Sequence, residues 1–193
     1  RAVCNDTGQN SRMVRLSSLI TLLLLAGCAS GPRIDTRYEA ASQDSRVQFL
    51  ILHFTSDRFE KSLNVLTQGP VSSHYLVSEA TADSPPLIYR LVEESRSAHH
   101  AGASFWKGHA QLNASSIGVE IVNDGYRDTP EGRIWYDFPQ AQIDAVIELV
   151  QDIVKRYAIK PSRVLGHSDI APGRKTDPGP AFDWARYRRL LLE

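Results

Sequence analysis

Separated segments of the chain carry side chains that suit metal chemistry. His53 ends an apolar, β-rich run, and His167 and Asp177 share one loop that prolines and glycines stiffen. Such a loop can aim its two side chains at a single point. Two imidazoles and one carboxylate suit Zn²⁺ and leave one coordination position open for water. Glu120, inside a second apolar run, is then free to act as a base.

Each of these residues alone also has an ordinary structural explanation. His53 could be a hydrogen-bonded core histidine, and His167 and Asp177 could belong to a solvated loop. Glu120 either faces a polar site or forms a buried salt bridge, because an unpaired buried carboxylate is costly. The occurrence of His53, His167 and Asp177 together favours the metal site.

The motifs around these residues resemble the zinc-dependent N-acetylmuramoyl-L-alanine amidases of the amidase-2 family, which are related to peptidoglycan recognition proteins and T7 lysozyme. The resemblance runs from about residue 47 to residue 184. It rests on motifs that occur in family order at residues 52–55, 71–77, 98–102, 113 with 116–120, and 166–180.

The resemblance implies a role for individual residues. His53, His167 and Asp177 match the three zinc ligands of the family. Glu120 matches its catalytic glutamate, a proton shuttle of a kind worth about 10² to 10⁴ in rate. Lys175 matches the lysine that stabilises the developing oxyanion. Without the motif, Lys175 would be interpreted as a solvated surface residue.

Three more residues have a less specific match. His100 and Asn113 resemble positions that line the substrate groove of the family. His74 has either a role in the site or a buried structural one. In part of the superfamily a tyrosine precedes the equivalent of His74, whereas Ser73 stands here. This departure favours Glu120 over a catalytic tyrosine.

These matches predict hydrolysis of the amide between the lactyl group of N-acetylmuramic, or anhydro-N-acetylmuramic, acid and L-alanine of the stem peptide. The implied partner is peptidoglycan or its muropeptides, and no protein partner is implied. A peptidoglycan-binding module without catalysis is the main alternative, which the complete ligand set and Glu120 argue against. A zinc peptidase is a second alternative, but the chain has no His-Glu-x-x-His motif.

Charge and length exclude other classes. The 193 residues contain 22 Lys and Arg against 22 Asp and Glu, without a basic stripe, so nothing indicates a nucleic-acid partner. The length predicts one domain. Cys4 and Cys28 are the two cysteines, so no disulfide is expected in the residues that follow Cys28.

The N-terminal region has the pattern of a bacterial lipoprotein signal. A positive segment at residues 13–16 precedes an apolar run at 19–25 that is too short to span a bilayer, and Leu-Ala-Gly-Cys at 25–28 resembles a lipobox. An ordinary cleaved signal or a buried helix is the alternative. We expect an upstream flank over 1–12, a signal peptide over 13–28, a tether over 29–45 and a zinc amidase domain over 46–193.

Lipidation of Cys28 would anchor the protein to a membrane. The several acyl chains that a lipobox implies anchor firmly, since each buried methylene contributes about 0.8 kcal/mol. Ala29 follows the cysteine at a position where aspartate is typical of lipoproteins kept at the inner membrane. The expected location is therefore the outer membrane of a Gram-negative bacterium, facing the periplasm.

Strands and helices must position the candidate site. The apolar run at 47–52 predicts a central strand that is covered on both faces. We also expect strands over 73–78, 86–91 and 117–122, the first two as a hairpin. Helices are expected from Ser56 or Asp57 to about 66, from a cap at Asp137 to 157, and from about 183. These elements predict an α/β fold, with a mixed central β-sheet flanked by helices on both faces.

Overall fold

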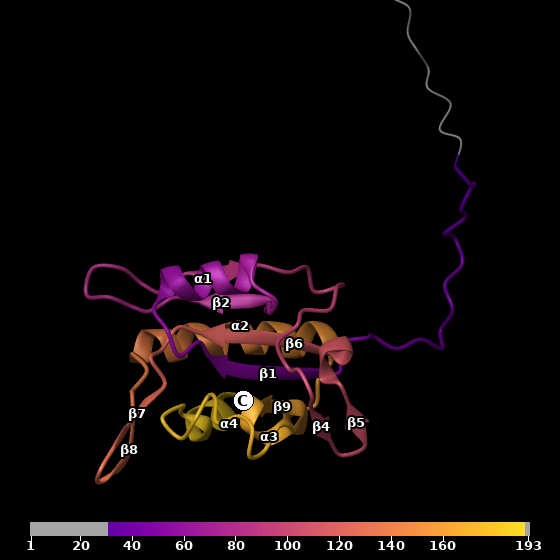
Figure 1. Ribbon diagram of the computed structural model, residues 1–193. Coiled ribbons are helices and arrows are strands. Elements are labelled where there is room, and N and C mark those ends of the chain that lie inside the picture. Colours follow the sequence, from indigo (N-terminus) through magenta and orange to yellow (C-terminus); the bar gives the residue numbers. More distant parts are fainter. Residues whose placement is uncertain (1–30, 192–193) are drawn as a thin grey trace, which may run out of the picture. The chain divides into compact units, whose positions relative to one another are not determined.

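The structure is a computed structural model that describes residues 31–191 (Figure 1). It divides into two compact parts between Ala41 and Ser42. Residues 31–45, which cover most of the expected tether, are exposed and contain no helix or strand. The expected signal peptide and Cys28 lie outside the described residues. Within residues 31–191, no helix is both long and apolar enough to cross a membrane.

A mixed five-stranded sheet, in the order β3-β2-β6-β1-β9, forms the centre of the second part. β1 pairs in parallel with β6 and β9, β2 pairs in parallel with β6, and β3 is antiparallel to β2. Figure 1 shows β1 and β6 side by side in the middle of this sheet. The bounds are β1 Phe49–Phe54, β2 Tyr75–Val77, β3 Ile88–Arg90, β6 Ser116–Ile121 and β9 Val164–Gly166.

Helices cover both faces of this sheet, which confirms the predicted fold class. The larger core lies between the sheet and helices α2 and α4, and two smaller clusters on the opposite face include residues of α1 and α3. The bounds are α1 Phe59–Gln68, α2 Gln140–Tyr157, α3 His167–Ile170 and α4 Trp184–Leu191, with 3₁₀ helices η1 Leu112–Ser115 and η2 Pro161–Arg163.

Alternation along β1 places His53 opposite the larger core. Leu52 and Phe54 pack in the core cluster with α2, so His53 between them points to the other face of the sheet. Glu120 is the register partner of His53 in the parallel neighbour β6. The two candidate residues therefore lie side by side near the carboxyl ends of adjacent strands.

Helix starts differ in two places from the sequence expectation. α1 follows Arg58, and neither Ser56 nor Asp57 caps it. Asp57 instead forms a β-bridge with Asn123, which holds the chain extended before the helix. α2 follows Pro139, so Asp137 is not its N-cap.

Two short hairpins were not predicted. β4 Phe105–Trp106 pairs with β5 His109–Ala110, and β7 Tyr126–Thr129 pairs with β8 Gly132–Trp135. Their strands are short and mostly exposed, so they lack the apolar pattern that marks the central strands.

Candidate metal centre and active site

The structure brings His53, His167 and Asp177 together at one buried point. Their exposed fractions are 1%, 3% and 6%. The two Nδ1 atoms lie 2.9 Å apart, and Asp177 Oδ2 lies 2.9 Å from His53 Nδ1 and 3.1 Å from His167 Nδ1. A tetrahedral Zn²⁺ with bonds of about 2.0–2.1 Å separates neighbouring ligand atoms by about 3.3 Å. The three atoms are thus spaced closely enough to share one ion.

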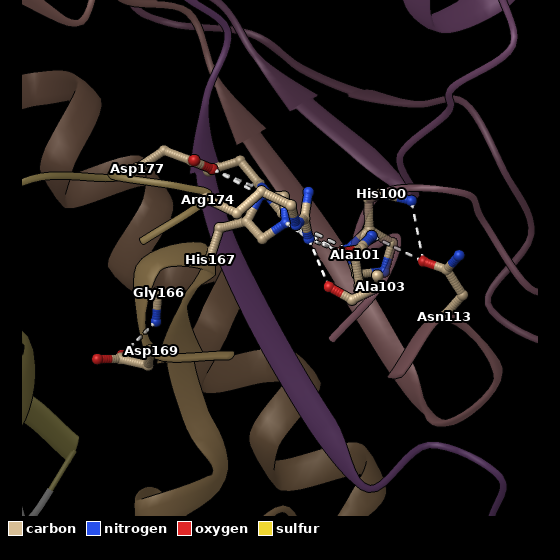
Figure 2. A network of polar contacts seen from close by, with 10 residues as sticks. His100, Ala101, Ala103, Asn113, Gly166, His167, Asp169, Arg174 and Asp177 are labelled. Carbon is tan, nitrogen blue, oxygen red and sulfur yellow. Dashed lines mark hydrogen bonds and ion pairs between the residues drawn. The ribbon is translucent and has the colours of Figure 1, made fainter. Parts of the chain in front are cut away.

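Backbone contacts around α3 hold His167 and Asp177 in this arrangement. β9 ends at Gly166, whose N–H donates to Asp169 Oδ2 at 2.8 Å (Figure 2). The loop then returns, because the Ser168 N–H donates to the carbonyl oxygen of Asp177 at 3.0 Å. The strand end and the returning loop therefore place His167 and Asp177 beside each other.

The charge states of the ligands suit a dication. Burial lowers the pKa of His53 to about 4, so the ring is neutral at neutral pH, as a metal ligand must be. Burial opposes ionisation of Asp177, but its contacts with His167 and His53 hold the pKa of this carboxyl well below its usual range. The group therefore offers ring nitrogen atoms together with one carboxylate.

The hydrogen bond of His167 Nε2, the ring nitrogen that faces away from Asp177, tests whether the three residues fit a metal ion. Its Nε2 lies 3.1 Å from the carbonyl oxygen of Ala101, which only accepts, and 3.4 Å from the Arg174 guanidinium, which only donates, so the shorter contact favours a proton on Nε2. In this tautomer, the lone pair of Nδ1 faces the Asp177 carboxylate, 3.1 Å away. Two ring lone pairs and a carboxylate that converge in this way suit a cation between them, and the residues present fit Zn²⁺.

Glu120 holds a buried carboxylate oxygen without a partner. Its Oε2 has no hydrogen-bond partner in the described part of the chain. Burial, reinforced by the charge of Asp177 and opposed by that of Lys175, raises the pKa of Glu120 to about 8. An unpaired buried carboxylate is costly, and a strongly shifted pKa is typical of functional sites. These observations favour a polar site over a structural salt bridge.

A cavity of about 220 Å³ opens beside the ligands. Glu120 and the exposed Lys175 line it together with the three ligands. Apolar side chains at the end of α1, including Val65, form another part of the wall. His99 also lines this cavity, although no role was predicted for it from the sequence. Its position next to His100 in the motif at residues 98–102 could have indicated that it lies at the site.

His74, His100 and Asn113 make their polar contacts within the protein. His74 is fully buried; its Nδ1 accepts from the Gly118 N–H at 3.0 Å and its Nε2 donates to the Arg96 carbonyl at 3.1 Å, which favours its structural alternative. His100 reaches the cavity wall with an exposed fraction of 8%, and burial, with the nearby His53, holds its pKa well below the ordinary value. The Asn113 Oδ1 accepts from backbone N–H groups (Figure 2).

The fold and the site together define an α/β protein with a buried His-His-Asp group that could bind a metal, in a cavity near the carboxyl ends of parallel strands. The family of N-acetylmuramoyl-L-alanine amidases (Amidase_2) matches residues 43–180. The chain belongs to this family, as its motifs predicted.

Individual relatives agree with this family. The chain is 45% identical over 172 residues to "N-acetylmuramoyl-L-alanine amidase AmiD" of Escherichia coli (strain K12). The matched region covers 84% of this chain and 62% of that relative. A solved complex of AmiD from E. coli with the substrate anhydro-N-acetylmuramic acid-L-Ala-D-gamma-Glu-L-Lys has a TM-score of 0.77 at 43% identity, covering 82% of this chain and 63% of that chain. The structure of AmpDh3 from Pseudomonas aeruginosa in complex with anhydromuramic pentapeptide has a TM-score of 0.76 at 38% identity. The match covers 81% of this chain and 65% of that chain. The chain thus spans less than two thirds of each.

Proposed function

We propose that this chain is a Zn²⁺-dependent amidase domain that cleaves the bond between N-acetylmuramic, or anhydro-N-acetylmuramic, acid and L-alanine in peptidoglycan or muropeptides. The observation that carries the proposal is the Glu120 oxygen that, within the described part of the chain, has no partner and shares a cavity with the buried candidate ligands. The solved complexes of AmiD and AmpDh3 with anhydromuramyl peptides support this class of substrate.

His53, His167 and Asp177 would hold the metal. When bound, Zn²⁺ supplies a Lewis acid that polarises a carbonyl and lowers the pKa of water to about 7. Glu120 accepts the proton of the attacking water and returns it to the L-alanine nitrogen as the C–N bond breaks. Beside a dication the Glu120 carboxylate ionises more readily, so it is available as a base at neutral pH.

Lys175 would stabilise the negative charge that develops on the carbonyl oxygen. Its side chain is exposed and lines the same cavity as Glu120. Removal of one donor to such an oxyanion typically costs about 10² to 10³ in kcat. Its position in the cavity supports this role over that of a solvated surface lysine.

The alternative is a peptidoglycan-binding module without catalysis. Such a module needs a groove but has no use for a buried carboxylate that lacks a partner, which costs about 1–3 kcal/mol or more. Glu120 therefore favours the enzyme.

We also propose that the protein is a lipoprotein of the outer membrane, with the domain in the periplasm. The lipobox-like sequence that ends at Cys28 supports the anchor. The exposed residues 31–45, without helix or strand, support a tether between the anchor and the domain.

Product analysis tests the function. We expect the zinc-loaded protein to convert an anhydro-N-acetylmuramyl peptide into the free sugar acid and a peptide that begins with L-alanine, as seen by mass spectrometry. A chelator should stop the reaction and added Zn²⁺ should restore it. Bound but uncut muropeptide would instead identify a binding module, and L-alanine left on the sugar acid would identify a peptidase.

A further inference from the structure

We propose that the dipeptide His100–Ala101, held by Asn113, supplies the outer hydrogen-bond partners of both histidine ligands and so fixes both rings with Nδ1 toward the metal. This inference rests on the zinc site of the proposed function. It makes His100 and Asn113 positioning residues, a role that differs from the groove contact expected from the sequence.

The ring protons on the His53 side follow one after another from a backbone carbonyl. Ser116 Oγ lies 2.6 Å from the Leu112 carbonyl oxygen, which only accepts, so the hydroxyl proton points there. His100 Nε2, 3.1 Å from the same Oγ, must then be the donor to Ser116. The Nδ1 of the neutral His100 ring is left as an acceptor, and His53 Nε2 donates to it at 3.0 Å. The lone pair of His53 Nδ1 is thereby free for a metal.

Ala101 provides the corresponding contact for His167. Its carbonyl oxygen accepts from His167 Nε2 at 3.1 Å, as described above, and from the Arg174 guanidinium at 2.8 Å. The same guanidinium nitrogen donates to the Ala103 carbonyl at 2.7 Å, which ties the segment to the ligand loop (Figure 2). His100 and Ala101 therefore contact the Nε2 atoms of the two histidine ligands, on the side of each ring away from the proposed metal.

Asn113 holds this dipeptide through one oxygen atom. Its Oδ1 accepts from the backbone N–H of His100 at 3.1 Å and of Ala101 at 2.7 Å (Figure 2). Loss of this acceptor would loosen both outer contacts at once. Outer partners of this kind set the orientation and the tautomer of metal-bound histidines, and their removal typically costs about 10- to 100-fold in metal affinity or activity.

Gly118 provides the space for the His100 ring. A Cβ atom at this position would lie 2.5 Å from His100 Cγ, so the ring packs directly on the backbone of β6. Ile51, two residues before His53, is the register partner of Gly118 in β1. Gly118→Ala would therefore displace the ring without removing any hydrogen-bonding group.

Zn²⁺ affinity, measured by competition with a chromophoric chelator and without muropeptide, is the direct test. We expect His100→Ala and Gly118→Ala to weaken binding about 10- to 100-fold. His100→Asn, which offers an acceptor oxygen near the former Nδ1, should recover part of the loss. His109→Ala is the matched control: it removes a ring that packs on Phe49, 5.0 Å away, and should leave zinc affinity unchanged.

A second readout is the tautomer of His53 in the metal-free protein, observed by ¹⁵N NMR of the rings. We expect a proton on Nε2 in the wild type and loss of this preference in His100→Ala. A folded His100→Ala protein with wild-type zinc affinity overturns the proposal; weaker muropeptide binding in that protein would assign His100 to the groove. If His100→Ala does not fold, Ser116→Ala and Asn113→Ala decide the question by the same two measurements.

The inference and the proposed function can fail separately. Zinc affinity that depends on His100 in a protein that leaves muropeptides uncut supports the inference and overturns the amidase. A wild-type protein that binds no zinc overturns both.

Discussion

Glu120 carries the proposed chemistry because one of its carboxylate oxygens is buried and has no hydrogen-bond partner among residues 31–191. Glu120→Gln keeps the size of the side chain but removes the base, so the fold, the zinc content and muropeptide binding should persist while turnover drops about 10²-fold or more. Thermal midpoint, zinc content and amidase rate are to be measured on one preparation. A stable, zinc-loaded variant that cuts at the wild-type rate would refute the assignment.

The raised pKa of Glu120 predicts that the free energy of unfolding of the metal-free protein depends on pH. The pKa of Glu120 is about 8 in the fold, against an ordinary value of 4.5, so the folded state retains a proton that the unfolded chain has released. Its contribution to stability is complete below about pH 4.5 and is lost as the pH rises through about 8. Denaturant titrations from pH 5 to 8 should show this loss in the wild type and not in Glu120→Gln. Parallel pH profiles for the two proteins would contradict the raised pKa.

Side-chain chemistry made the meeting of His53, His167 and Asp177 predictable, since few residue types bind zinc. The contacts behind them were not predictable in the same way. Ala101 and Leu112 contribute carbonyl oxygens, which every residue has, so nothing in their identity marks the role. Only the packing of distant segments reveals these contacts.

Among the elements, β1, β6 and α2 could be predicted because long apolar patterns mark them. The hairpin β7–β8 could not, since its strands are largely exposed. It depends on tertiary contacts instead: Arg133 stacks over the Tyr126 ring at 3.6 Å, and Trp135 packs edge-on against Phe54 with ring centroids 6.3 Å apart.

Trp135 also connects this hairpin to the ligand loop, which yields a matched pair of variants. Gly179 has φ +73°, and a Cβ there would lie 2.6 Å from the Trp135 ring. Gly173 has φ +78°, and a Cβ there would meet no other atom of the described residues within 4 Å. Gly173→Ala should cost about 1 kcal/mol for the left-handed backbone. Gly179→Ala should cost about 1–3 kcal/mol more, because it also overpacks the contact. Unfolding in urea measures both, and equal losses would show that the Trp135 contact is unimportant.

For the whole molecule, the proposed anchor at Cys28 would decide where the proposed amidase works. Cys28→Ser removes the thiol that carries the lipid, so the protein should move from the membrane fraction to the soluble fraction. A shortened protein that starts at Ser30 should retain full amidase activity, since the proposed site residues all lie between His53 and Asp177. Fractionation that leaves Cys28→Ser in the membranes would reject this anchor.

Hydrolysis of an anhydro-N-acetylmuramyl peptide in H₂¹⁸O tests the central claim most directly, because it reports the bond that is cut and the nucleophile together. Water that attacks the lactyl carbonyl beside Glu120 should place one ¹⁸O atom in the carboxyl group of the sugar acid. The released peptide should begin with L-alanine and carry no label. Label in the peptide, or a sugar acid that still carries L-alanine, would contradict an N-acetylmuramoyl-L-alanine amidase.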